Sequence, residues 1–222
     1  MATEQELRNE VVRASRHLYR RGLLCAYEGN VSVRLPGQDE APGHTLLMTP
    51  TRRCKGELLP KDLVLLGAEG QVIGKGQAST ESPLHVGIYQ HMPSVCAVVH
   101  AHAPYTTAFA CTAGGLQHMV QPELLVLLGG SPPMAPYAPP GSSRLFDSVK
   151  DLLQQSPVIL LERHGVVATS TRGVMDAVYL VEQVEQVARI SWLASRLGSL
   201  PALDPDEQAA LVRGRIQADG LA

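Results

Sequence analysis

The chain has 222 residues, of which 45% are hydrophobic, so it is long and apolar enough to bury a substantial core. It has 19 Lys and Arg residues against 21 Asp and Glu residues, which gives a net charge of -2. The chain therefore lacks the excess positive charge of proteins that bind nucleic acid or an anionic membrane. The four cysteines form no CxxC pair and no apolar run is long enough to span a bilayer, so we expect one cytoplasmic domain over residues 1–222 without a disulfide framework.

The first predicted element is an amphipathic helix over residues 3–21. Thr3 and Glu6 have the spacing of a capping box, and Gly22 follows the last apolar position of the helical repeat. This charged segment lacks the uninterrupted apolar stretch of a secretory signal. Residues 28–35 then alternate between apolar and polar side chains, which predicts a strand.

The rest of the chain contains short predicted strands and further helices. Strands are predicted at residues 44–48, 63–67, 71–74, 96–103, 158–162 and 166–170, and helices at residues 79–92, 173–198 and 204–216. The stretch at residues 129–143 is rich in proline and glycine and carries Tyr137, so we interpret it as a structured loop. This pattern predicts an α/β domain with a largely antiparallel sheet.

A pair of histidines predicts a metal site. His100 and His102 follow an apolar run that ends at Val99, so they occupy positions i and i+2 of a strand and project from the same face. Catalytic zinc usually takes three protein ligands and keeps a fourth position open. His164, in a turn between two apolar strands, is the best third candidate, and Glu81 adds a carboxylate. A single histidine is more often a hydrogen-bonded or exposed residue than a ligand, and only the joint pattern favours a metal.

The segment around Glu81 has two interpretations. His85 lies one helical turn after Glu81, so it either faces the same pocket or orients the carboxylate through a hydrogen bond, and we favour the second. Ser79 and Thr80 look like the start of a helix, where free N–H groups attract phosphate. An ordinary capped helix is the commoner outcome for such a motif.

Two other segments carry candidate anion ligands. Asn30 opens a predicted strand, and Thr51 and Arg52 end another, followed by Arg53 and Lys55. These residues could together cradle a dianion, but a run of cations is commonly a solvated loop.

Taken in chain order, the segments GNVSVR, MTPT, STE followed by LH, AVVHAHA, PYAPPGS and RHGVV resemble the class II aldolase/adducin family. The matching blocks run from residue 29 to residue 167, and with the flanking helices the resemblance covers nearly the whole chain. It implies a three-layer α-β-α sandwich with a central, mainly antiparallel sheet. It also implies a homotetramer with active sites at the subunit boundaries.

The resemblance also assigns functions to individual residues. It implies that His100, His102 and His164 bind one Zn²⁺ per subunit, with Mn²⁺, Co²⁺ and Fe²⁺ left open. It makes Glu81 an acid/base that also ligates the metal when no substrate is bound. The phosphate contacts of the family map onto Asn30, Thr51, Ser79 and Thr80.

Two positions depart from the aldolases of this family. Arg52 replaces a glycine that follows the threonine, so the phosphate pocket, with Arg52 as a candidate ligand, is rebuilt or differently sized. Glu123 stands where a tyrosine from a neighbouring subunit is the proton donor on the alcohol side. Glu123, Tyr137 and Tyr105 are the candidates to replace that tyrosine, although each is more often an ordinary loop or packing residue.

These residues together predict a zinc-dependent aldolase. It would cleave a ketose 1-phosphate of the fuculose 1-phosphate type, with the metal stabilising the enediolate and Glu81 protonating it to give dihydroxyacetone phosphate and a short aldehyde. Glu81 argues against the decarboxylases that resemble this family, in which lysine commonly replaces the acid. The alternatives are an epimerase or dehydratase, a metal-dependent hydrolase and, less readily because the three histidines are kept, a non-catalytic adducin-like scaffold.

Overall fold

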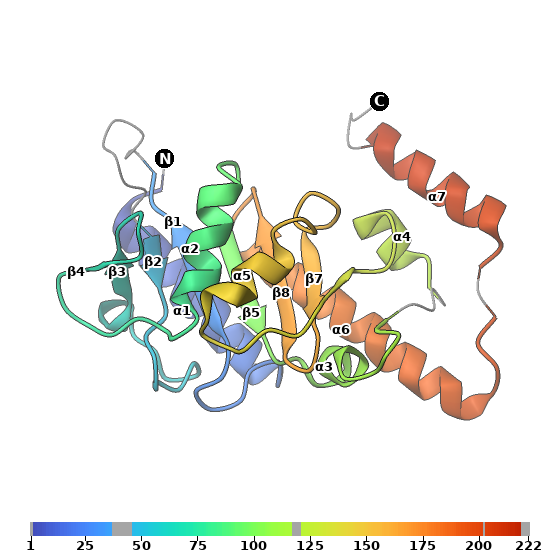
Figure 1. Cartoon of the computed structure of the whole chain (residues 1–222), viewed down its shortest axis with the longest axis horizontal. Coiled ribbons are helices and arrows are strands. Elements are labelled where there is room, and N and C mark those ends of the chain that lie inside the picture. The colour runs from blue at the N-terminus through green and yellow to red at the C-terminus, as the bar shows by residue number, and fades with distance from the viewer. Residues whose placement is uncertain (1, 37–45, 117–120, 202, 219–222) are drawn as a thin grey trace.

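The computed structural model describes residues 2–36, 46–116, 121–201 and 203–218. Within these residues eight strands form one sheet in the order β4-β3-β2-β1-β5-β8-β7-β6 (Figure 1). The strands are β1 Asn30–Arg34, β2 Leu46–Met48, β3 Val64–Leu66, β4 Val72–Ile73, β5 Ala97–Ala101, β6 Met134–Ala135, β7 Val158–Leu161 and β8 Gly165–Ser170. All neighbouring strands run antiparallel except β6 and β7, which are parallel, so the predicted, mainly antiparallel sheet is confirmed.

Helices cover both faces of this sheet. They are α1 Glu4–Arg20, α2 Ser82–His91, α3 Pro104–Ala110, α4 Glu123–Leu128, α5 Ser143–Val149, α6 Val174–Leu197 and α7 Pro205–Ala218, with a 3₁₀ turn η1 at Pro60–Asp62. Buried residues of α1, α3, α4 and α6 belong to the core on one face, and those of α2 and α5 belong to the core on the other. The predicted three-layer α-β-α arrangement is confirmed, while α7 packs on α4 at one end of the molecule (Figure 1).

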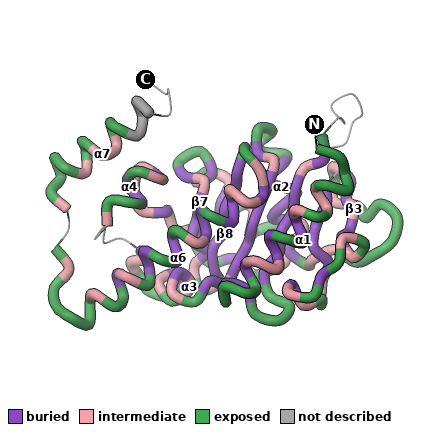
Figure 2. Tube along the Cα trace, turned by 180° about the vertical axis from the view of Figure 1, so that it is seen from behind, coloured by how far each residue is buried: buried purple, intermediate pink, exposed green. Residues whose placement is uncertain are grey.

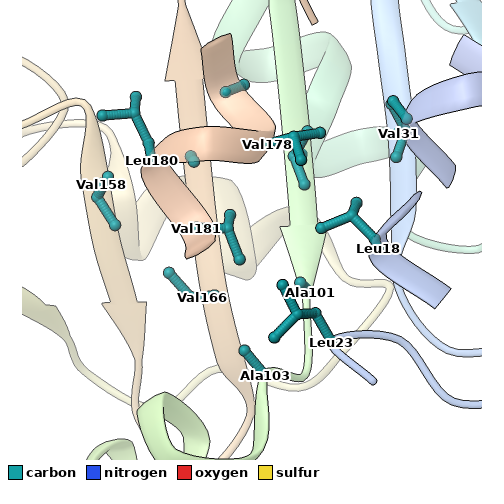
Figure 3. Packing of buried hydrophobic residues seen from close by; sticks show 14 of the residues in the cluster. Leu18, Leu23, Val31, Ala101, Ala103, Val158, Val166, Val178, Leu180 and Val181 are labelled. Carbon is teal, nitrogen blue, oxygen red and sulfur yellow. The ribbon is translucent and has the colours of Figure 1, made fainter. Parts of the chain in front are cut away.

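The period-two alternation of the central strands separates the two cores. In β5, Val99 and Ala101 face α6, whereas Val98 faces α2 and α5. Val166 and Val178 lie in the same core as Ala101 (Figure 3). Each fully buried valine or leucine contributes about 1.5–3 kcal/mol, so these layers hold β5 firmly in the centre of the sheet.

The long helices follow their predicted boundaries. Thr3 caps α1 in a capping box with Glu6, and α6 runs between Gly173 and Gly198. Strands β7 and β8 are buried along their whole length, whereas α7 is mostly exposed (Figure 2). Among the described helices, none has both the length and the apolar character needed to cross a bilayer.

Several local predictions were incomplete. The second predicted strand begins outside the described residues, and β2 starts at Leu46. Helix α2 begins at Ser82 with Glu81 as its N-cap residue, so Ser79 and Thr80 precede the helix instead of capping it. The Ser79 hydroxyl accepts a hydrogen bond from the Glu81 N–H, a local turn that competes with helix formation. Five short elements were not predicted, because so few residues give little periodicity: η1, α3, α4, α5 and β6.

One residue of the loop after β2 has a backbone conformation that suits glycine. Arg52 has a φ of 51°, in the left-handed region, at the position where the resemblance led us to expect glycine. A residue with a Cβ atom costs about 1–2 kcal/mol in this conformation. The loop therefore keeps the shape of a glycine turn in spite of the substitution.

We expect Arg52→Gly to raise the free energy of unfolding by about 1 kcal/mol, because glycine adopts this φ without the Cβ clash. Arg52→Ala is the matched control, since it removes the guanidinium but keeps the Cβ atom. Urea unfolding at one protein and metal concentration measures both variants. Equal stabilities of the glycine and alanine variants would contradict strain at this position.

Candidate metal centre

The candidate centre lies where several chain segments meet at the end of β5. His100 is in β5 and His102 lies just beyond its last residue, while His164 occupies the turn between β7 and β8. Asn30, the first residue of β1, pairs with His100 across the sheet. Glu81 reaches the same point from the start of α2.

Two glycines allow the neighbouring segments to approach β5 closely. A Cβ atom at Gly29 would lie 2.7 Å from the backbone oxygen of His100, and one at Gly165 would lie 2.5 Å from that of Ala101. Gly29 also has a φ of 65°. Only glycine fits both positions without moving the strand that carries the histidines.

The three histidines are arranged as a metal-binding set. Their ligand atoms all lie within 4.8 Å of one another. The Nε2 atoms of His100 and His102 are 3.1 Å apart. Glu81 lies 3.2 Å from His100 Nε2 through Oε2 and 3.1 Å from His164 Nε2 through Oε1. Ligand atoms about 2.0–2.1 Å from a tetrahedral zinc ion stand roughly 3.3–3.4 Å apart, and the three shorter separations given above are close to this value.

Hydrogen bonds on the outer ring nitrogens orient two of these histidines. His100 Nδ1 donates to the backbone oxygen of Val166 at 3.0 Å, which leaves the Nε2 lone pair free for a metal. His102 Nδ1 lies 3.4 Å from Glu28 Oε2, a carboxylate that is half exposed. Burial lowers the pKa of His100 to about 4. The attraction of Glu81 opposes this shift, and repulsion from His102 and His164 adds to it. The ring is therefore neutral and able to bind a metal.

Glu81 is an ionised carboxylate beside the three rings. Burial alone raises the pKa of Glu81. The opposing effects are larger: Glu81 is attracted to His100, is hydrogen-bonded and attracted to His164, and accepts a hydrogen bond from Asn30. Together they hold the pKa well below its usual range. Asn30 Nδ2 donates to Glu81 Oε2 at 2.7 Å and to the Ser79 hydroxyl at 3.1 Å. Asn30 therefore fixes the carboxylate in place.

A buried polar chain continues behind Asn30. His85 Nε2 donates to Asn30 Oδ1, Ser32 donates to His85 Nδ1 at 2.6 Å, and the Tyr89 hydroxyl donates to Ser32 at 2.9 Å. Burial, with repulsion from His100, lowers the pKa of His85 to about 3, so its ring is neutral and the direction of the chain is fixed. His85 acts on Glu81 through Asn30, not by the direct contact that the helical spacing predicted.

A cavity of about 280 Å³ opens beside the histidines. Asn30, Thr51, Ser79 and Thr80 line it together with Glu81, His102 and His164. All the predicted anion ligands except Arg52 and Arg53, and all the predicted metal ligands except His100, therefore border one hollow. Its size suits a small metabolite of a few carbon atoms.

Some predicted residues lie elsewhere. Arg52 is exposed and lines a neighbouring hollow with Tyr19 and Glu57, not the cavity beside the histidines. Glu123 starts α4 and lines a separate cavity near α7. Tyr137 is 53% exposed on its loop, and Tyr105 packs near Trp192.

Two charged residues of the cavity received no definite role from the sequence: Lys55 was one of three cations in a possible anion cradle, and Glu28 was not singled out. Both line the cavity, and Lys55 is 1% exposed. Lys55 follows two arginines, a pattern typical of a solvated loop, so its burial gave no local signal. Glu28 directly precedes the Gly29-Asn30 motif, and this adjacency was the one indication in the sequence that Glu28 lies at the cavity.

Comparison with known proteins agrees with this geometry. The family model described as "Class II Aldolase and Adducin N-terminal domain" matches residues 9–192. The 3-oxo-tetronate 4-phosphate decarboxylase of Escherichia coli K12 is 30% identical over 201 residues, covering 89% of this chain and 90% of that protein. The L-fuculose phosphate aldolase of Methanococcus maripaludis strain S2 is 31% identical over 188 residues, covering 85% and 97%. The crystal structure of YgbL from Klebsiella pneumoniae superposes with a TM-score of 0.84 at 30% identity, covering 95% and 100%.

These relatives count against one expectation. Glu81 led us to disfavour decarboxylases, yet decarboxylases are among the relatives that align over most of both chains. The identity of this residue alone is therefore a poor guide to which bond is cleaved.

We expect His102→Ala to bind divalent metal more than about 100-fold more weakly. Mutation of a residue that only hydrogen-bonds to a metal ligand already lowers metal affinity by about 10–100-fold, and loss of a ligand should cost more. Elemental analysis after dialysis against a weak chelator measures the metal content. His91→Ala, at an exposed position of α2, is the matched control. Equal metal content in the two variants would remove His102 from the ligand set.

Proposed function

Because the chain belongs to the class II aldolase and adducin family, we propose that it is a metal-dependent lyase that removes CO₂ from a 3-oxo sugar acid phosphate. The metal would be one divalent cation, Zn²⁺ in the first instance, held by His100, His102 and His164. Bound there, it supplies Lewis-acid stabilisation of negative charge on the substrate oxygens. A relative of the 3-oxo-tetronate 4-phosphate decarboxylase type supports this substrate class.

The chemistry of decarboxylation and of aldol cleavage converges on one enediolate. In a 3-oxo-tetronate 4-phosphate, the C1–C2 bond breaks, CO₂ leaves, and the electron pair moves onto the C3 oxygen. In a ketose 1-phosphate, the C3–C4 bond breaks, an aldehyde leaves, and the same three-carbon enediolate is formed. Protonation of its carbon gives dihydroxyacetone phosphate in both reactions, so one acid/base serves either leaving group.

We propose Glu81 as the group that moves this proton. It is ionised, held by Asn30, and borders the cavity, so as a base it can take a proton from the hydroxymethyl carbon of dihydroxyacetone phosphate. In the direction of cleavage Glu81 must first take up one proton from solvent, and by microscopic reversibility the protonated acid then delivers it to the enediolate carbon. The buried chain through His85 keeps Asn30, and therefore Glu81, in a single orientation.

The residues that line the cavity favour decarboxylation over aldol cleavage. Aldol cleavage needs a base for the hydroxyl proton of the departing aldehyde, whereas CO₂ leaves without any proton transfer. Glu123, Tyr137 and Tyr105, the candidates for that base, do not line the cavity of their own chain, so aldol cleavage would take this base from a neighbouring subunit, as the family resemblance implies. Decarboxylation therefore requires no group beyond those that border the site.

Aldol cleavage is the second candidate. The aldolase of Methanococcus maripaludis aligns with this chain over 97% of its own length. We keep the ketose 1-phosphate substrates, with dihydroxyacetone phosphate and an aldehyde as products, as the alternative to decarboxylation. The single domain, the homotetramer and the cytoplasmic location stay predictions from the sequence.

We expect the metal-loaded protein to release CO₂ and dihydroxyacetone phosphate from a 3-oxo-tetronate 4-phosphate, at least about 100-fold more efficiently than it cleaves any ketose 1-phosphate. A coupled assay for dihydroxyacetone phosphate measures both, and the matched sugars without phosphate are the controls. Efficient cleavage of a ketose 1-phosphate without decarboxylation would make the second candidate correct. A product with an intact carbon chain would instead indicate an epimerase or dehydratase.

We expect Glu81→Gln to lower turnover by about 10²–10⁴-fold, because the amide cannot carry the proton. The same variant should lose the exchange of the hydroxymethyl hydrogen of dihydroxyacetone phosphate in D₂O, followed by NMR. Glu69→Gln, which alters an exposed carboxylate outside the cavity, should match the wild type in both measurements. Normal exchange in Glu81→Gln would exclude Glu81 as the acid/base.

A further inference from the structure

The cavity beside the histidines contains one lysine in an unusual setting. Lys55 lines this cavity with Thr51, Ser79 and Thr80, and its side chain is among the largest that are fully buried in the molecule. Lysine is seldom fully buried without a charged partner. The position of its ammonium group therefore needs an explanation.

Two backbone carbonyls hold this ammonium group. Lys55 Nζ donates to the oxygens of Tyr27 and Arg53, each at 3.1 Å. A lysine ammonium has three N–H donors, so one is not used by these bonds. Carbonyl groups are neutral and leave the charge uncompensated.

The described part of the chain offers Lys55 no close counter-ion. None of its ion pairs within 4.0 Å involves Lys55. Burial lowers the pKa of Lys55 to about 8, and the attraction of Cys54 and Glu81 offsets part of this effect. Removing an unpaired charge from water costs several kcal/mol, and a bound anion would recover this cost.

We propose that Lys55 binds the phosphate group of the substrate and thereby gives this site its preference for phosphorylated sugars. This inference rests on the proposed function, because it assumes that a sugar phosphate occupies the cavity. It replaces Arg52, the cation selected from the sequence, which is exposed and lines a different hollow.

The hydroxyl groups around Lys55 favour phosphate over the carboxylate of the same substrate. Thr51, Ser79 and Thr80 line the same cavity and supply further hydrogen-bond donors. A lysine paired with the carboxylate would stabilise the charge that decarboxylation must remove, and so would slow the reaction. The phosphate keeps its charge throughout the reaction, so a lysine bound to it does not raise the barrier of the cleavage step.

We test this proposal by titrating the metal-free protein with inorganic phosphate, followed by calorimetry. We expect Lys55→Gln and Lys55→Met each to weaken phosphate binding by about 10-fold or more, since a charge-assisted hydrogen bond is lost. Glutamine keeps donors for the two carbonyls, which separates loss of the charge from loss of the loop contacts. Lys61→Met, at an exposed lysine, is the matched control and should bind phosphate as the wild type does.

A folded Lys55 variant that binds phosphate as tightly as the wild type would overturn the proposal. Glycolate, which carries a carboxylate and no phosphate, is the second probe. A variant that loses glycolate binding and keeps phosphate binding would move Lys55 to the carboxylate end of the substrate, which also overturns the proposal. Since no turnover is involved, these results are independent of whether the protein decarboxylates its substrate.

The wild-type protein provides a measurement that needs no stable variant. The chain has only four lysines, so ¹⁵N labelling of lysine gives few ammonium signals. We expect phosphate to shift the signal of the buried lysine and to slow its hydrogen exchange. A spectrum in which phosphate leaves that signal unchanged would also overturn the proposal.

Discussion

The register of β5 between β1 and β8 is the constraint on which the site depends. Backbone hydrogen bonds pair His100 with Asn30 on one side and with Val167 on the other. A slip of one residue would turn His100 into the core beneath α6, because side chains alternate between the two faces of a strand. The same register places Val166, whose carbonyl fixes the ring of His100, beside the metal ligands. Sheet pairing thus sets both the position and the protonation of the first ligand.

The charges around the cavity form a second constraint. Glu81 and Lys55 are of opposite sign and border the same hollow, while His100 and His85 are held neutral by burial. A divalent cation and a phosphate dianion add equal and opposite charge to this set. The cation, the phosphate, Lys55 and Glu81 would then balance one another, which limits the cost of burying these groups, and the substrate carboxylate would remain as excess negative charge.

The same arrangement explains how one family can break different bonds. In the proposed reactions the three histidines with their metal, Glu81 and Lys55 would act on the three carbons that become dihydroxyacetone phosphate, and these carbons are common to both candidates. Only the departing group differs. Most residues that line the cavity lie in turns and loops, which change more readily than the central strands. The relatives of this chain accordingly include decarboxylases and aldolases at similar identity.

The sequence by itself determined the elements that have a strong period and the ligands that follow directly from them. The alternation of residues 28–35, the helical repeat of α1 and α6, the HxH spacing and the turn that carries His164 are local patterns, and the family resemblance supplied the layered fold. Only the tertiary structure decided which positively charged side chain lines the cavity beside the histidines. Arg52, Arg53 and Lys55 are equivalent in the sequence, yet Lys55 is buried and the two arginines are exposed. The left-handed turn at Arg52 and the carbonyls of Tyr27 and Arg53 impose this difference, and such contacts depend on how the loop folds back on the chain and not on residue order.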